Sequence, residues 1–128
     1  QQVTKLGLQS HITFVGHRAD VQEILALSTL VYSLSTSPES FGRTTLEALS
    51  MGKPVIGYSH GGVQEQLAKL FPDGLVPVGA IQDAIEKTKA FLEGTPTMQE
   101  QHTFTLEAMC SQTLALYQDL LIRDEQLQ

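Results

Sequence analysis

One segment of the sequence leads from a loop into a helix and on into a strand: Ser37-Pro-Glu-Ser-Phe-Gly-Arg-Thr-Thr-Leu-Glu-Ala-Leu-Ser-Met-Gly-Lys-Pro-Val-Ile56. It follows an apolar run at residues 30–34, which has the length of a buried strand. The Thr44-Thr45 pair can open the helix, and Gly52 ends it before Pro54. In open α/β sheets, ligands bind where a loop leaves the carboxyl end of a strand and enters a helix. The segment therefore predicts an α/β fold with a ligand site at this loop.

The rest of the chain continues the same alternation. Short apolar runs at residues 11–15, 30–34, 55–58 and 75–78 are the predicted strands. Asp20 and Gly61-Gly62 precede two more amphipathic segments of helical length. This order is typical of a parallel sheet with flanking helices. We expect residues 1–128 to form one partial domain, with βα units at about 11–79 and C-terminal helices at about 80–94 and 100–122.

The composition excludes several classes of function. The chain has 128 residues, of which 41% are hydrophobic and 17% charged, and a net charge of -6. That charge argues against nucleic acid as a partner, because nucleic-acid affinity depends on cations that neutralise phosphates. No run approaches the roughly eighteen apolar residues of a membrane helix, so we expect a cytoplasmic protein that can lie peripherally at the inner face of the membrane. The start at Gln1-Gln2 suggests a piece excised from a longer protein.

The loop before the predicted helix carries residues suited to an anion and to hydroxyl groups. Gly42 permits close backbone approach, and the amides around residues 41–44 would point from a helix N-terminus toward a diphosphate. Glu39 lies ahead of these amides and Glu47 about one turn into the helix. One carboxylate could accept hydrogen bonds from the hydroxyls of a sugar, and the other from those of a ribose.

These residues belong to a longer ordered string. Glu39 and Glu47 form a Glu-x7-Glu pattern, accompanied by Ser40-Phe41-Gly42, by Gly52-Lys53-Pro54-Val55-Ile56, and by Gly61-Gly62 with Glu65. The string resembles the donor-binding half of the family 4 retaining glycosyltransferases, also called group 1. The resemblance implies the C-terminal, Rossmann-like domain of a two-domain B-type fold. It also implies a transferase that moves a hexose from a nucleoside diphosphate to a glycan, lipid or small acceptor, as in polysaccharide biosynthesis.

The resemblance also assigns roles to single residues. Glu39 would be the catalytic residue that contacts the donor sugar, and Glu47 would hold the ribose of the nucleotide. The remaining donor-binding residues would be Phe41, Gly42 and Arg43 through their amides, Thr44 or Thr45 through a hydroxyl near a phosphate, and the Gly16-His17 turn beside the base. The family needs no metal and no cofactor apart from the nucleotide sugar, and its acceptor is bound by an N-terminal domain.

The sequence departs from the family pattern before His11. Two further family strands, with a Gly-Arg segment and a lysine that neutralise the diphosphate, have no counterpart there; Arg43 and Lys53 are the nearest cations. The sheet would close the gap by direct re-pairing, by swapping with another copy in a homo-oligomer, or by leaving an edge open. We expect this chain alone to be inactive without the acceptor domain.

Other interpretations compete with a transferase. One is a non-catalytic binding or interaction module with the same fold; others are a two-carboxylate hydrolase using Glu39 and Glu47, and a nicotinamide dehydrogenase, for which no Gly-x-Gly-x-x-Gly follows a strand. The four histidines lack the spacing of metal ligands. Cys110 lies on an apolar stripe of the last helix, which predicts core packing. In the family this helix crosses the N-terminal domain, so part of it would be exposed in this chain.

Overall fold

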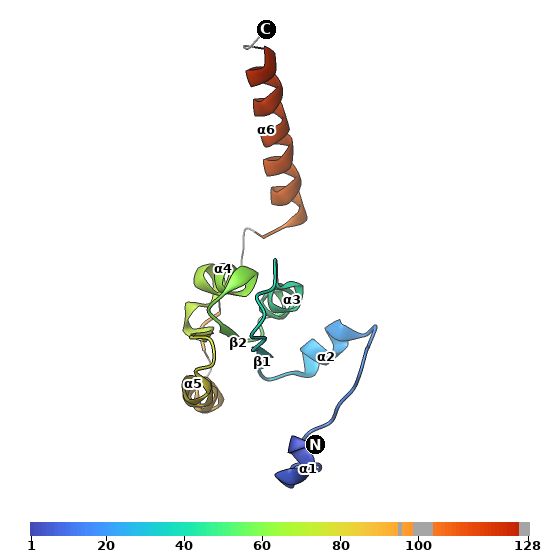
Figure 1. Cartoon of the computed structure of the whole chain (residues 1–128), viewed down its shortest axis with the longest axis vertical. Helices are drawn as coiled ribbons and strands as arrows, with labels where there is room; N and C mark the ends of the chain where they lie inside the picture. The colour runs from blue at the N-terminus through green and yellow to red at the C-terminus, as the bar shows by residue number, and fades with distance from the viewer. Residues whose placement is uncertain (95, 99–103, 126–128) are drawn as a thin grey trace.

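The computed structural model describes residues 1–94, 96–98 and 104–125. The fold is α/β, as the sequence predicts. In chain order the elements are α1 (Gln2–Lys5), α2 (Val21–Leu27), β1 (Val31–Ser33), α3 (Arg43–Ser50), β2 (Val55–Tyr58), α4 (Gly61–Leu70), a 3-10 turn (Pro72–Gly74), β3 (Leu75–Val76), α5 (Ile81–Glu93) and α6 (Leu106–Glu125) (Figure 1).

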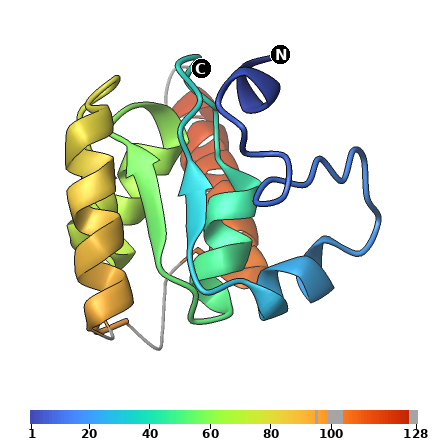
Figure 2. The same cartoon turned by 90° about the horizontal axis from the view of Figure 1, so that it is seen from below.

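The three strands form a parallel sheet in the order β1-β2-β3. Val31 pairs with Val55, and Gly57 pairs with Leu75. Every residue of β2 is buried, because helices cover both faces of the central strand. Val55 packs toward α3 and α4, whereas the next residue, Ile56, packs toward α5. Figure 2 shows α5 on one side of the strands and α3 on the other. This alternation along β2 follows from the two-residue period of a strand.

The predicted strand at residues 11–15 is wrong. This segment has no strand structure, and the Phe14 ring is 83% exposed. Figure 1 shows the N-terminal segment leading away from the sheet before α2. A strand needs a neighbouring edge for its backbone groups. Within the described residues β1 pairs with β2 alone, so direct re-pairing does not give β1 a second neighbour and its other edge is open in the single chain.

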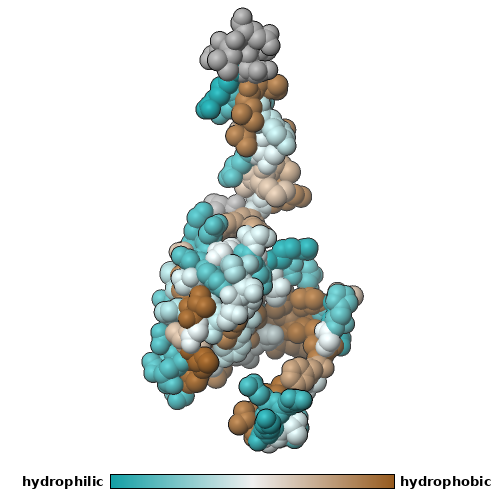
Figure 3. Space-filling view, viewed as in Figure 1, coloured by the Kyte–Doolittle hydropathy of each residue, from teal (hydrophilic) through white to brown (hydrophobic). Residues whose placement is uncertain are grey.

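The predicted core packing of the last helix is also wrong, whereas the expectation that part of this helix is exposed agrees with the structure. α6 projects from the body, and its apolar side chains are exposed, Leu106 by 73% (Figures 1 and 3). Cys110 is exposed as well. Contact with the body is made at the start of the segment, where the Phe104 ring meets the Phe41 ring edge-on at 6.5 Å. The described residues hold no surface that covers the rest of α6. Predicted helix residues 100–103, including His102, lie outside the described residues.

None of the described helices is both long enough and apolar enough to cross a bilayer.

Candidate functional site

The N-terminus of α3 presents a row of free backbone amides. The N–H groups of residues 42–45 have no acceptor within the described part of the chain, and no side chain caps the helix. Gly42, the residue before the helix, has a φ of 80°, which favours glycine. A Cβ atom there would lie 3.0 Å from the Val63 side chain. A helix start with free amides attracts anions, because its dipole and its N–H groups point the same way.

A cavity of about 270 Å³ lies where β1 ends and α3 begins. It is lined by Val31, Tyr32, Ser33, Leu34, Ser35, Glu39, Thr44 and Thr45. Thr45 is only 1% exposed, and its hydroxyl has no hydrogen-bond partner within the described residues. A buried hydroxyl without a partner costs free energy. The structure therefore brings Glu39, Thr44 and Thr45 together at one cavity that holds an unsatisfied polar group.

The loop that carries Glu39 is clamped onto the start of α4. The Gly62 N–H donates a hydrogen bond to the Glu39 carbonyl at 2.8 Å. A Cβ atom on Gly61 would lie 2.5 Å from the Glu39 carbonyl oxygen, and one on Gly62 only 2.4 Å from the Phe41 carbonyl oxygen. A side chain at either position would collide with backbone. The glycine pair is thus more than a connector, because it allows α4 to approach the loop closely.

Arg43 and Glu47 lie one helical turn apart on α3. Their charged groups are 3.8 Å apart, and the Arg43 side chain is 86% exposed. Neither residue lines the 270 Å³ cavity, and Glu47 is half-buried. The Arg43 backbone amide belongs to the free row, whereas its side chain points into solvent beside Glu47.

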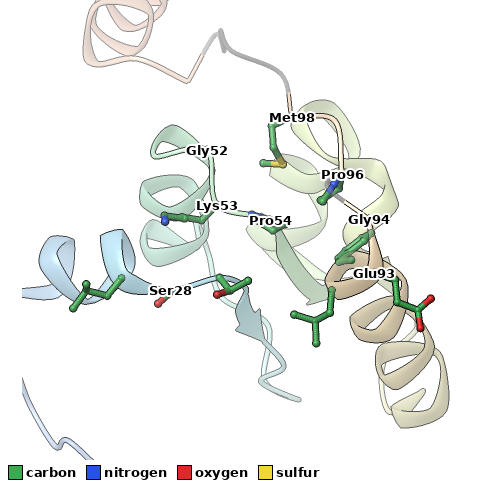
Figure 4. A pocket seen from close by; sticks show the side chains of 12 residues that line it. Ser28, Gly52, Lys53, Pro54, Glu93, Gly94, Pro96 and Met98 are labelled. Atoms are coloured by element: carbon green, nitrogen blue, oxygen red, sulfur yellow. The ribbon is translucent and has the colours of Figure 1, made fainter.

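Three further residues named from the sequence also lie apart from this cavity. Gly16 and His17 are exposed between α1 and α2 and do not line it. Lys53 lies just before β2, at the amino-terminal end of the strands and away from the cavity at the end of β1, and its Nζ donates to the Ala26 carbonyl at 2.7 Å. There it borders a second cavity of about 510 Å³ (Figure 4). Lys53 therefore stabilises the end of α2 and is distant from the free amides.

Sequence reasoning missed two contacts that hold the loop. His60 Nε2 lies 2.8 Å from the Ser35 carbonyl oxygen. The Gln66 side-chain amide donates to the Phe41 carbonyl. The signal for Gln66 was present, because it occupies the apolar face of α4 between Val63 and Leu70, where a polar residue is unexpected.

The described residues contain no group of three or more His, Cys, Asp or Glu side chains that could hold a metal ion.

The chain is similar in sequence to known glycosyltransferases. Residues 1–116 match the family model described as "Glycosyl transferases group 1". The chain is 32% identical, over 120 residues, to the 2-deoxystreptamine N-acetyl-D-glucosaminyltransferase of Streptomyces fradiae, with 91% of the chain and 27% of the relative covered. It is 42% identical, over 65 residues, to the N-acetyl-alpha-D-glucosaminyl L-malate synthase of Bacillus anthracis, covering 51% of the chain and 17% of that protein.

Two solved structures of Anabaena HepE also match this chain. A crystal structure of Anabaena HepE in complex with UDP and glucose matches with a TM-score of 0.68 and 36% identity, covering 73% of this chain and 26% of HepE. A complex of HepE with UDP-glucose matches with a TM-score of 0.62 and 37% identity, covering 72% of this chain. The chain thus spans about a quarter of HepE. With the family model matched from residue 1 to residue 116, this protein belongs to the group 1 glycosyltransferases, family 4.

Proposed function

We propose that this chain binds the nucleotide-sugar donor of a retaining hexosyltransferase. The observation that carries the proposal is the row of free amides at residues 42–45, next to the cavity lined by Glu39 and the unpartnered Thr45 hydroxyl. An anion would accept hydrogen bonds from the free amides, and a group with several hydroxyls would donate hydrogen bonds to the Glu39 carboxylate. A nucleoside diphosphate sugar carries both groups in one molecule.

Each residue then has a definite role. The amides of Phe41, Gly42 and Arg43 face the sugar and the diphosphate, and a hydroxyl of Thr44 or Thr45 lies near a phosphate. Glu39 orients the sugar by accepting hydrogen bonds from its hydroxyls, and Glu47 accepts those of the ribose. Gly16 and His17 would contact the base once the N-terminal segment lies beside the site. This last role requires the segment to move, since both residues are outside the cavity.

The contribution to transfer is electrostatic and positional. Negative charge accumulates on the diphosphate as the bond to the sugar breaks, and preorganised amides at a helix start stabilise that charge. Glu39 keeps the sugar in a fixed orientation relative to the leaving group. No nucleophile from this domain is required for either effect.

The nature of the donor can be narrowed through the relatives. HepE has been crystallised with UDP-glucose. The names of the two enzymes from Streptomyces fradiae and Bacillus anthracis both contain the N-acetylglucosaminyl group. We therefore place UDP-hexoses first among the donors of this chain.

The alternative is a binding module without turnover. It is favoured by the side chains lining the cavity, which include no lysine or arginine to neutralise a diphosphate. The chain also spans only 27% of the Streptomyces fradiae relative. We expect the parent protein to be a glycosyltransferase, whose acceptor is held by an N-terminal domain, and this chain alone to catalyse no transfer.

An amide-resolved NMR titration of the chain tests the proposal. UDP, GDP, ADP and their glucose conjugates are added separately, and the signals of Glu39, residues 41–45, Glu47 and the Gly16-His17 turn are followed. We expect weak binding of UDP and UDP-glucose, with dissociation constants of about a millimolar, because no lysine or arginine is among the described residues that line the cavity.

The outcomes separate the candidates. Shifts confined to these residues with one nucleotide would support the donor site and name the base. Shifts absent with all ligands would refute donor binding by this chain. Release of glucose from UDP-glucose by the chain alone would contradict the expectation that it is inactive.

A further inference from the structure

Gln66 is a polar residue in an apolar environment. It lies on the face of α4 that also carries Val63 and Leu67, and it is only 1% exposed. Burying a primary amide is unfavourable unless its groups are hydrogen-bonded. A residue of this kind needs a reason other than the packing of α4.

Only one end of the Gln66 side chain is satisfied. Its Nε2 donates to the Phe41 carbonyl, whereas its Oε1 has no hydrogen-bond partner within the described residues. An amide that is half satisfied contributes little to stability, and an apolar side chain of the same size would serve the core as well. What the amide does achieve is to hold one specific backbone carbonyl of the loop.

Holding this carbonyl determines where the next amide points. The bond between Phe41 and Gly42 is a trans peptide, in which the C=O and the following N–H point in opposite directions. With its carbonyl drawn toward Gln66, this peptide must direct the Gly42 N–H away from α4. That N–H is the first of the four free amides at the start of α3.

We propose that Gln66 is a positioning residue of the donor site, which turns the peptide between Phe41 and Gly42 so that the Gly42 N–H is available to the bound anion. The inference rests on the proposed function, and it adds a residue that does not itself contact the donor. The two glycines of α4 act in the same direction, since they allow the loop to approach closely enough for this hydrogen bond.

A pair of matched variants tests the positioning role. Gln66→Met removes the amide and keeps the length of the side chain; Gln64→Met makes the same change at an exposed position of the same helix. We expect Gln66→Met to shift the Gly42 and Arg43 amide signals and to weaken binding of UDP by roughly tenfold, while the unfolding midpoint stays within about 4 °C or rises. Gln64→Met should match the unmodified chain in its Gly42 and Arg43 amide signals, its affinity for UDP and its unfolding midpoint.

A measurement on the unmodified chain covers the case in which Gln66→Met does not fold. One proton of the Gln66 side-chain amide should exchange with solvent much more slowly than those of Gln64. Equal exchange for both side chains would overturn the proposal.

Two further results would also overturn it. One is unchanged Gly42 and Arg43 amide signals in a folded Gln66→Met variant; the other is a large fall in the unfolding midpoint with unchanged loop signals, which describes a purely structural residue. If the unmodified chain binds no nucleotide, the proposed function fails, whereas the Gly42 signal and the Gln66 exchange rate still decide whether the loop is positioned by Gln66.

Discussion

At Glu39 the backbone and the side chain have different tasks. The carbonyl accepts a hydrogen bond from the Gly62 N–H, which anchors the loop on α4. The side chain is exposed and lines the cavity at the end of β1. A change confined to the carboxylate therefore leaves the anchoring bond intact, and the two tasks can be separated experimentally.

Glu39→Gln tests the contact with the sugar. Replacing the carboxylate by an amide weakens the hydrogen bonds that it accepts, so the affinity for UDP-glucose should fall by about tenfold while the affinity for UDP is unchanged. Both affinities can be measured by NMR titration. Glu23→Gln, at an exposed position of α2, is the control and should change neither. An equal loss of affinity for both ligands would show that Glu39 does not act on the sugar.

Asp20 pairs with the neighbouring Arg18 instead of capping α2. It precedes α2, as the sequence predicts, yet its side chain makes no cap hydrogen bond. Instead Asp20 accepts a hydrogen bond from Arg18 Nε at 2.7 Å. The Arg18 guanidinium lowers the pKa of the Asp20 carboxyl below its ordinary value, because the positive charge favours the ionised form.

Removal of that charge should reverse the shift. We expect Arg18→Gln to raise the pKa of Asp20 back toward its ordinary value, measured from the pH dependence of the carboxyl carbon signal. A lowered pKa stabilises the folded state at pH values above the ordinary pKa, and this contribution is lost as the pH falls through the lowered value. The pair is exposed, so the change in stability should be small. Arg43→Gln, the control, should leave Asp20 unchanged.

Among the elements, α2 depends on a residue far along the chain. Its C-terminal carbonyl groups have no further helical N–H to accept from, and the Lys53 ammonium fills that need at Ala26. A cation at a helix C-terminus is also favourable with respect to the helix dipole. Lys53 therefore connects α2 to the segment that enters β2.

Lys53→Met should loosen α2 without affecting the donor site. We expect a loss of about 0.3–1 kcal/mol, seen as faster hydrogen exchange at the α2 amides, and unchanged binding of UDP. Lys89→Met, at an exposed position of α5, is the control and should change neither. Weaker UDP binding by Lys53→Met would contradict the placement of Lys53 at the amino-terminal end of the strands, away from the donor site.

For the whole molecule, the open edge of β1 is the principal liability. Unpaired strand edges are templates for pairing with another chain. The prediction of a homo-oligomer or a strand swap stays a prediction. The edge gives it a physical basis, because β1 has only one neighbour among the described strands.

Tyr32→Lys tests association through this edge. Tyr32 lies in the middle of β1, and its hydroxyl is 2.8 Å from the Thr88 hydroxyl. A lysine on the edge strand disfavours strand addition. If the unmodified chain forms a dimer in sedimentation experiments, the dimer dissociation constant should therefore be about tenfold higher, and association weaker, in the variant. Thr88→Ala removes the hydroxyl contact without adding charge and should leave association unchanged. A dimer insensitive to Tyr32→Lys would indicate a different interface.

Local pattern sufficed for most of the fold and for part of the site. The predicted strand at 55–58 coincides with β2, and the helix after the Glu39 loop begins within two residues of the expected position. The arrangement of Glu39, Thr44 and Thr45 around one cavity follows from the same strand–loop–helix order. These features depend on neighbours in sequence, which the periodicity and the glycines record directly.

The sequence by itself determined the parallel α/β order, the loop at the carboxyl end of β1 and the helix start that follows it, because turn residues and hydrophobic period act over short distances. Only the tertiary structure decided that residues 11–15 form no strand, that α6 stands exposed, and that Lys53 lies far from the amides. It alone revealed Gln66 beneath the loop. Each of these depends on which surfaces meet across the fold, and an apolar or charged residue carries no local record of its distant partner.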